Sequence, residues 1–194
     1  MRTTNDPLGL LGDVAAILEQ GARRFALVGG LAVSLRAEVR FTRDVDLAVA
    51  VTDDRDAENL IFTMHAAGYT PTTTVEQEAR GRLAAARLRA PGGMMVDLMF
   101  ASTGIETEII DRALPVALPG TGYIAVARAE ELLAMKILSM ADDRPQDRLD
   151  VRSLLAFTPA MDVQSVRDTL ELITARGYHR GKDLVALLDQ FVTG

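Results

Sequence analysis

Cysteine and tryptophan are absent from this chain of 194 residues, and histidine occurs only twice. Because there is no cysteine, disulfides, thiolate metal sites and cysteine nucleophiles are all excluded. No stretch approaches the roughly 18 apolar residues of a membrane span, and the N-terminal segment lacks the apolar core of a signal peptide. We therefore expect a cytoplasmic protein with no membrane contact.

Positive charge is also limited, and lysine is its rarest carrier. The formal net charge is -6, so the composition does not favour broad electrostatic binding of nucleic acid, and any contact with RNA needs a local cluster of arginines. Of the 21 basic residues, only Lys136 and Lys182 are lysines. A lysine kept in such an arginine-rich set indicates a role that arginine does not fill.

The hydrophobic patterns divide the chain into two parts. Short apolar runs alternate with helical spacing at first, which predicts an α/β core over residues 1–126. Only helical spacing follows, which predicts a C-terminal helical part over residues 127–194, packed on the core. The expected strands are 25–28, 46–51, 83–88, 95–100 and 115–126, and the expected helices are 8–21, 31–35, 53–68, 103–113, 128–142, 146–157, 163–176 and 182–192.

The sharpest motif is Gly29-Gly30 at the end of the first strand, followed after 13 residues by Asp44-x-Asp46. Because side chains alternate along a strand, both carboxylates should point to one side. They repel each other unless a cation lies between them, and Mg²⁺ or Mn²⁺ prefers such oxygen ligands, completed by substrate phosphates. Glycines before a helix let backbone N–H groups approach those phosphates. Each half alone is commonly a turn or a solvated strand end, but together they predict a metal and nucleotide site.

A third carboxylate, Asp97, lies among apolar residues on the predicted strand 95–100. An isolated carboxylate is costly to bury, so Asp97 needs a partner. One interpretation is an ion pair with Arg87 or Arg89 on the neighbouring strand. The other is a third member of the acidic cluster, which binds metal or acts as base toward the attacking hydroxyl. The sequence leaves both open.

Lys136 lies within the apolar stripe of the first helix after the core. Either it extends along apolar surface to water, or it reaches the phosphates of a nucleotide, which we favour. Asp147 and Asp150 share one face of the next helix. They can pair with Arg144 and Arg148, or they can orient Lys136.

The early motif resembles the nucleotidyltransferase signature of the DNA polymerase β type. In that signature a Gly-Gly or Gly-Ser pair precedes Asp-x-Asp or Asp-x-Glu, as Gly29-Gly30 precedes Asp44-x-Asp46 here. Many relatives have serine where this chain has Gly30, so a hydroxyl contact to phosphate is missing.

The later motif resembles the AbiEii toxin group, which includes the MenT toxins. In that group a helix lysine is followed by a pattern close to Arg-x-x-Asp-x-x-Asp, as Lys136 is followed by Arg144-x-x-Asp147-x-x-Asp150 here. The resemblance spans about residues 25–155.

The resemblance implies a nucleotidyltransferase fold, with a mixed sheet flanked by helices and a helical C-terminal part. It implies transfer of a nucleoside monophosphate from an NTP, in several members to the 3′ end of tRNA, and a small antitoxin as partner. Residues expected at the site are Gly29, Gly30, Lys136 and Asp147 for the nucleotide, Asp44, Asp46 and Asp97 for the metal, and the three carboxylates with Lys136 and Asp150 for catalysis.

The expected reaction is in-line attack of an acceptor hydroxyl on the α-phosphorus of the NTP, with pyrophosphate leaving. One alternative is an antibiotic nucleotidyltransferase acting on an aminoglycoside or lincosamide. Another is a catalytically silent binding protein, which the retained acids and Lys136 disfavour. An RNA acceptor predicts a local arginine surface, for which the candidates are Arg36, Arg40, Arg43, Arg80 and Arg82.

Overall fold

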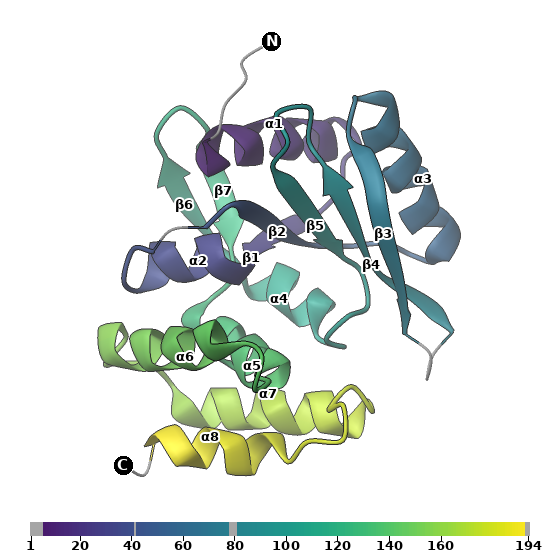
Figure 1. Ribbon diagram of the computed structural model, residues 1–194. Coiled ribbons are helices and arrows are strands. Elements are labelled where there is room, and N and C mark those ends of the chain that lie inside the picture. The colour runs from purple at the N-terminus through teal and green to yellow at the C-terminus, as the bar shows by residue number, and fades with distance from the viewer. Residues whose placement is uncertain (1–5, 41, 78–80, 193–194) are drawn as a thin grey trace.

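The computed structural model describes residues 6–40, 42–77 and 81–192. Figure 1 shows a twisted sheet flanked by helices, with the C-terminal helices stacked beneath it. Its strands are β1 (Phe25–Val28), β2 (Asp44–Val49), β3 (Thr70–Gln77), β4 (Arg82–Arg89), β5 (Met95–Met99), β6 (Leu114–Leu118) and β7 (Gly122–Val126). Its helices are α1 (Pro7–Gln20), α2 (Gly29–Arg36), α3 (Asp54–Ala66), α4 (Glu106–Arg112), α5 (Ala129–Ser139), α6 (Pro145–Phe157), α7 (Val163–Ala175) and α8 (Leu184–Val192).

The sheet is mixed, and β2 lies at its centre. The strand order is β3-β4-β5-β2-β1-β7-β6, with β2 parallel to β5 and antiparallel to β1. Along β2 the apolar side chains Val45 and Leu47 are fully buried, whereas Asp44 and Asp46, which alternate with them, are partly exposed. The expected α/β fold with a mixed sheet and helical C-terminal part is confirmed, and the central strand carries the acidic motif.

Two strands differ from the expectation. β3 was not expected, because its sequence TPTTTVEQ shows no apolar alternation, and it is exposed along nearly its whole length at the sheet edge. Its threonines favour a strand, but pairing with β4 supplies the decisive hydrogen bonds. The strand expected over 115–126 is instead the hairpin of β6 and β7. Its turn holds Gly120 at φ 76, a conformation that only glycine adopts without strain.

The C-terminal helices continue the hydrophobic core of the sheet. Buried side chains form one cluster that includes Leu27 of β1, Leu133 of α5 and Leu170 of α7. α5 is buried on most of its surface, because it packs against α2, α6, α7 and α8. In the ranges that the structure describes, no helix is long and apolar enough to cross a membrane.

Candidate active site

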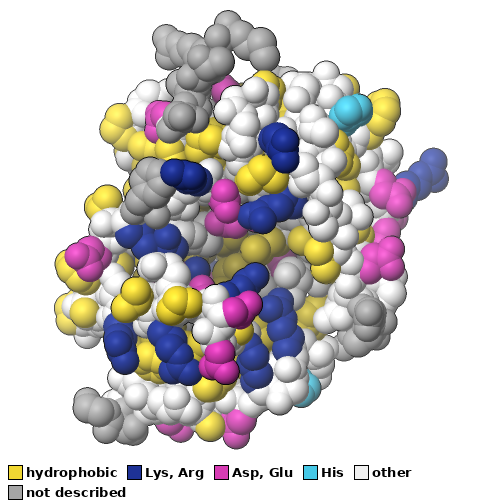
Figure 2. Space-filling view, in the orientation of Figure 1, with side chains coloured by type: hydrophobic (Ala, Val, Ile, Leu, Met, Phe, Trp, Pro, Cys, Tyr) yellow, Lys and Arg dark blue, Asp and Glu magenta, His cyan; other side chains and the backbone are white. Residues whose placement is uncertain are grey.

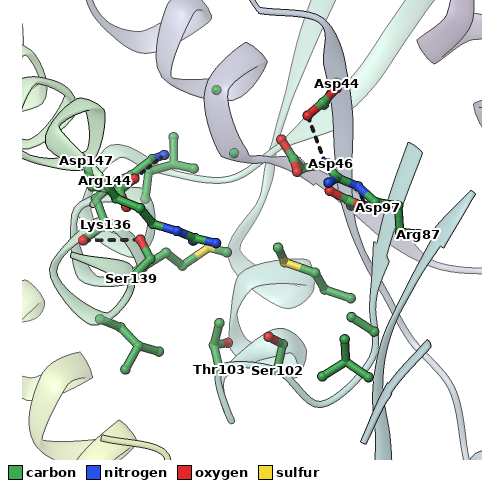
Figure 3. A pocket seen from close by; sticks show the side chains of 18 of the residues that line it. Asp44, Asp46, Arg87, Asp97, Ser102, Thr103, Lys136, Ser139, Arg144 and Asp147 are labelled. Carbon is green, nitrogen blue, oxygen red and sulfur yellow. Dashed lines mark hydrogen bonds and ion pairs between the residues drawn. The ribbon is translucent and has the colours of Figure 1, made fainter. Parts of the chain in front are cut away.

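The three predicted metal ligands lie together on one face of the sheet. Parallel pairing of β2 with β5 sets Asp46 opposite Asp97, and Asp44 lies two residues earlier on the same face of β2. All three line one cleft, as Figure 3 shows. The expectation that Asp44 and Asp46 point to one side is confirmed.

Arg87 of β4 holds the two outer carboxylates. It donates from Nε to Asp97 Oδ1 and from Nη2 to Asp44 Oδ2, both at 2.9 Å. The antiparallel register of β4 and β5 places Arg87 directly beside Asp97. The ion pair considered for Asp97 is therefore present, with Arg87 and not Arg89 as its partner. Because the Arg87 side chain is 44% exposed, it is free to leave these carboxylates without unfolding the strand.

Asp46 forms no ion pair with Arg87 and is repelled by the carboxylates of Asp44 and Asp97. Burial, together with the charges of Asp97 and Asp44, raises the pKa of Asp46 to about 6, against the lowering effects of Lys136 and a hydrogen bond from the Gly30 backbone. Burial also raises the pKa of Asp97, although Arg87 opposes the rise. The cluster therefore carries more negative charge than its neighbours offset.

The donor set fits a hard divalent cation, with one rearrangement. As they stand, no three acidic side chains in the described part of the chain converge to hold a metal, since Arg87 binds both Asp44 and Asp97. Yet the donors are carboxylate oxygens, which Mg²⁺ and Mn²⁺ prefer. A cation placed here would offset the repulsion between Asp46 and its neighbouring carboxylates, which contributes to the raised pKa of Asp46. Release of Arg87 from one carboxylate would complete the site.

The glycine pair makes room for two side chains. α2 begins at Gly29 itself, two residues earlier than expected, and Gly29 has a φ of 64. A Cβ there would collide with the carboxylate of Asp46, and a Cβ on Gly30 would lie 2.6 Å from Nη2 of Arg40. A serine at position 30 would therefore require the guanidinium of Arg40 to shift. Backbone N–H groups of the first turn of α2 remain beside the acidic cluster.

Lys136 is enclosed by carboxylates on the helical side of the cleft. Its Nζ lies 3.0 Å from Asp147 Oδ1 and 2.9 Å from Asp150 Oδ2. Asp150 is 1% exposed and also accepts hydrogen bonds from Arg40 and Gln146. Although burial opposes it, these hydrogen bonds hold the pKa of Asp150 below its usual range.

Asp147 and Asp150 therefore orient Lys136, as one of the two expectations had it, and neither forms an ion pair with Arg144 or Arg148. Lys136 and Asp147 line the cleft, whereas Asp150 is not among its lining residues. Asp150 therefore has no direct access to the cleft and instead holds Lys136 in position.

The cleft between the sheet and the helical part has a volume of about 600 Å³, within the range of small-molecule sites. Figure 2 shows basic side chains gathered around a hollow on this face of the molecule. Sequence reasoning assigned no site role to Arg144, which precedes α6, or to Arg180, between α7 and α8, yet both line the cleft. Membership of the later motif is a sequence signal that could identify Arg144 as a site residue, whereas no local sequence pattern identifies Arg180. Ser102, Thr103 and Ser139 also line the cleft.

The loop that forms part of the cleft wall is fixed by one buried carboxylate. Glu106 accepts hydrogen bonds from the backbone N–H groups of Ser102, Thr103 and Gly104 at 2.7, 2.6 and 3.0 Å. Arg180 donates to the carbonyl of Ser102 at 3.2 Å. The loop is therefore tied both to α4 and to the C-terminal helices.

The arginines expected to bind RNA are placed differently from one another. Arg36 donates to the backbone carbonyls of Val126 and Ala127, and Arg40 is engaged with Asp150. Arg43 is exposed beside the acidic motif, and Arg82 lies 3.5 Å from Asp54. Arg80 lies outside the described residues. These positions make Arg43 and Arg82 the two surface candidates of that set.

Comparison with known proteins agrees with this geometry. The sequence matches the family described as "Nucleotidyl transferase AbiEii toxin, Type IV TA system" over residues 13–192. A search of curated proteins gave no match. Among solved structures, the chain is similar to an antigenic nucleotidyltransferase-like protein from Paracoccidioides brasiliensis, with 18% identity, a TM-score of 0.53 and 98% of each chain covered.

The chain is also similar to the antibiotic-resistance factor ANT(2'')-Ia, with 14% identity, a TM-score of 0.57, and 87% of this chain and 91% of that chain covered. At these identities the structural likeness shows the nucleotidyltransferase fold alone. The family match extends from α1 to the end of α8. The protein therefore belongs to the AbiEii nucleotidyltransferase toxin family and is a nucleotidyltransferase.

Proposed function

We propose that this enzyme transfers the nucleoside monophosphate of an NTP to a hydroxyl at the 3′ end of tRNA, as a toxin neutralised by a cognate antitoxin protein. One observation carries the transfer: three carboxylates on the sheet face three basic side chains on the helical side, across a single cleft. A nucleotide with a divalent cation brings charge of both signs. The cation therefore complements the acidic wall, and the phosphates complement the basic wall.

The acidic wall would hold the cation through Asp44, Asp46 and Asp97. When bound, Mg²⁺ or Mn²⁺ would offset negative charge on the phosphoryl oxygens and on the leaving pyrophosphate. Asp46 would gain most, because burial and the charges of the neighbouring carboxylates raise its pKa. Arg87 would release at least one carboxylate and become available to an incoming anion.

The remaining steps belong to the chain's own groups. Asp97 lines the cleft and would accept the proton of the attacking hydroxyl. The N–H group of Gly29 would bind a phosphate oxygen at the start of α2, and that of Gly30 would bind another on leaving Asp46. Lys136 provides positive charge opposite the acids, in an orientation fixed by its carboxylate partners.

Family membership and charge distribution support a tRNA acceptor. The family is one of toxin–antitoxin systems, and the resemblance to the MenT toxins suggests the 3′ end of tRNA. The net charge of -6 makes binding depend on local arginines, of which Arg43 is exposed next to the acidic motif and Arg82 is partly exposed at the start of β4. The likeness to ANT(2'')-Ia supports the fold and does not by itself favour an antibiotic acceptor.

The test is incubation of the purified chain with total tRNA and each of the four α-³²P-labelled NTPs, with Mg²⁺ or with EDTA. Metal-dependent labelling of tRNA is expected with at least one NTP, and Asp46→Asn should abolish it. Labelling should also weaken as salt rises from about 50 to 200 mM, because phosphate contacts release counterions. Adenylylation of an aminoglycoside or lincosamide, with tRNA unlabelled by every NTP, would show that the acceptor is an antibiotic.

A further inference from the structure

Two arginines of the cleft differ from Lys136 in how their positive charge is balanced. Arg144 and Arg180 both line the cleft, and Figure 3 shows Arg144 extending into it. Among the residues that the structure describes, no carboxylate forms an ion pair with either one. Lys136 beside them has two carboxylate partners within 3.0 Å. On this wall, the positive charge available to a bound anion therefore comes from the two arginines more than from Lys136.

The backbone holds Arg180 in a specific position. Arg180 adopts a φ of 55 and is followed by Gly181 at a φ of 71, so a non-glycine residue is kept in the left-handed region, which is unfavourable in itself. Its Nη2 donates to the carbonyl of Ser102, a loop residue that Glu106 fixes. A guanidinium has five N–H donors, so this single contact leaves others for a ligand.

The two guanidinium groups also affect each other. Burial lowers the pKa of Arg180, the neighbouring charge of Arg144 lowers it further, and the charge of Glu106 opposes both effects. A bound anion relieves this repulsion, and the relief grows with each negative charge that the anion carries. A phosphodiester of an RNA chain carries one, whereas the terminal phosphates of an NTP carry several on adjacent groups, in the geometry that paired guanidinium groups bind well.

We propose that Arg144 and Arg180 form the binding site for the β- and γ-phosphates of the NTP, the group that leaves as pyrophosphate. This inference rests on the proposed function and adds the residues that recognise the triphosphate tail. It also changes the part expected of Lys136, which becomes a neighbour fixed by Asp147 and Asp150. The α-phosphate would then lie between this arginine pair and the acidic cluster.

Binding of tripolyphosphate to the full chain tests the proposal. Titration calorimetry in EDTA removes any contribution of metal, and no transfer takes place. Arg144→Gln and Arg180→Gln should each weaken binding about tenfold or more, because charge-assisted hydrogen bonds are lost. Arg144→Lys and Arg180→Lys keep the charge without the planar fork and should give a smaller loss. AMP, which lacks the tail, should bind equally to all variants.

Arg148→Gln is the matched control. Arg148 lies on the same helix as the motif, is exposed and does not line the cleft, so its removal should leave tripolyphosphate affinity unchanged. Thermal unfolding of every variant is recorded first, and the lysine variants decide the matter if a glutamine variant does not fold.

Three results would overturn the proposal. The first is that the wild-type chain does not bind tripolyphosphate, and the second is that both glutamine variants bind it with unchanged affinity. The third is that the glutamine variants bind an RNA oligonucleotide more weakly than the wild type while their affinity for tripolyphosphate is unchanged. The last result would assign the arginines to the acceptor. Failure of the proposed function is a separate outcome, since arginine-dependent binding of tripolyphosphate can be present in a chain that labels no tRNA.

Discussion

The charged side chains at this site differ in how far their neighbours neutralise them. Asp46 is repelled by Asp44 and Asp97, while Arg87 neutralises the outer two. On the opposite wall, Lys136 is bound by two carboxylates. Substitutions at these positions should therefore change stability and activity in different directions.

Asp46→Asn should abolish transfer and stabilise the metal-free protein. The pKa of Asp46 is about 6 when folded and near 3.9 in an unfolded chain, so its contribution to stability is full below about pH 3.9 and is lost as the pH rises through about 6. In EDTA, the free energy of unfolding of the variant should exceed that of the wild type by at most about 3 kcal/mol at pH 7.5, and match it at pH 4. Urea unfolding at both pH values measures this. An equal difference at both would contradict the assignment.

Lys136→Met should destabilise the protein, because it leaves buried carboxylates without their cation. Breaking a buried pair in this way costs about 3 kcal/mol, and Asp147→Asn in the same chain should recover part of the loss, since Asp150 keeps Arg40 and Gln146. Urea unfolding of the two single variants and the double variant gives the coupling energy. If Lys136→Met is more stable than the wild type, Lys136 merely extends along apolar surface.

At the scale of elements, the start of α2 and the face of β4 shape the acidic wall. α2 begins at Gly29, close to the carboxylate of Asp46. β4 presents Arg87 between two carboxylates. Each element makes a prediction with a control in the same chain.

Gly29→Ala should be far more harmful than Gly120→Ala. Both glycines have positive φ, 64 and 76, but a Cβ on Gly29 meets Asp46 whereas a Cβ on Gly120 meets nothing within 4 Å. The Gly120 variant measures backbone strain alone, about 1 kcal/mol, and should stay fully active. Thermal unfolding and transfer are measured on both. Equal effects would mean that Asp46 is not confined by α2.

Arg87→Gln should raise the affinity for Mn²⁺ in the absence of nucleotide. The guanidinium competes for the oxygens of Asp44 and Asp97, and glutamine brings no positive charge. Because Arg87 is 44% exposed, the free energy of unfolding should change by less than about 1 kcal/mol. Free Mn²⁺ measured by electron paramagnetic resonance gives the affinity. Arg89→Gln, on the same strand and away from these carboxylates, is the control; a lower affinity in the Arg87 variant would contradict competition.

At the scale of the whole molecule, the cleft needs both the sheet and the C-terminal helices. The acids come from β2 and β5, and the basic groups come from α5 and the segments beside α6 and α7. Arg176 joins α7 to α4 through Glu108, at 3.0 and 2.6 Å. The two walls are therefore parts of one packed structure.

The chain should unfold in one cooperative transition. Its buried side chains form one cluster across the sheet and helices, so neither part keeps a complete core when the other is lost. Calorimetric and van't Hoff enthalpies should agree, and circular dichroism should give the same midpoint. Two separate transitions would show that residues 127–194 fold as an independent domain, as the predicted division at residue 126 allows.

The sequence alone determined which residues form the acidic side of the site. Strand alternation placed Asp44 and Asp46 on one side, and the apolar run around Asp97 marked a carboxylate that needed a partner. Most helices and the buried strands were also predictable, because burial imposes a period on neighbouring residues. The exposed β3 was not, since an edge strand has no such period.

Only the tertiary structure decided which charges meet. Arg40 and Asp150 are 110 residues apart, and the pairing of Arg87 with Asp44 depends on the position of β4 beside β5. Arg180 reaches the cleft only because α7 packs against α5. Local patterns describe what each side chain requires, such as burial or a partner of opposite charge. Which residue meets that requirement depends on chain packing over long sequence distances, which no local pattern contains.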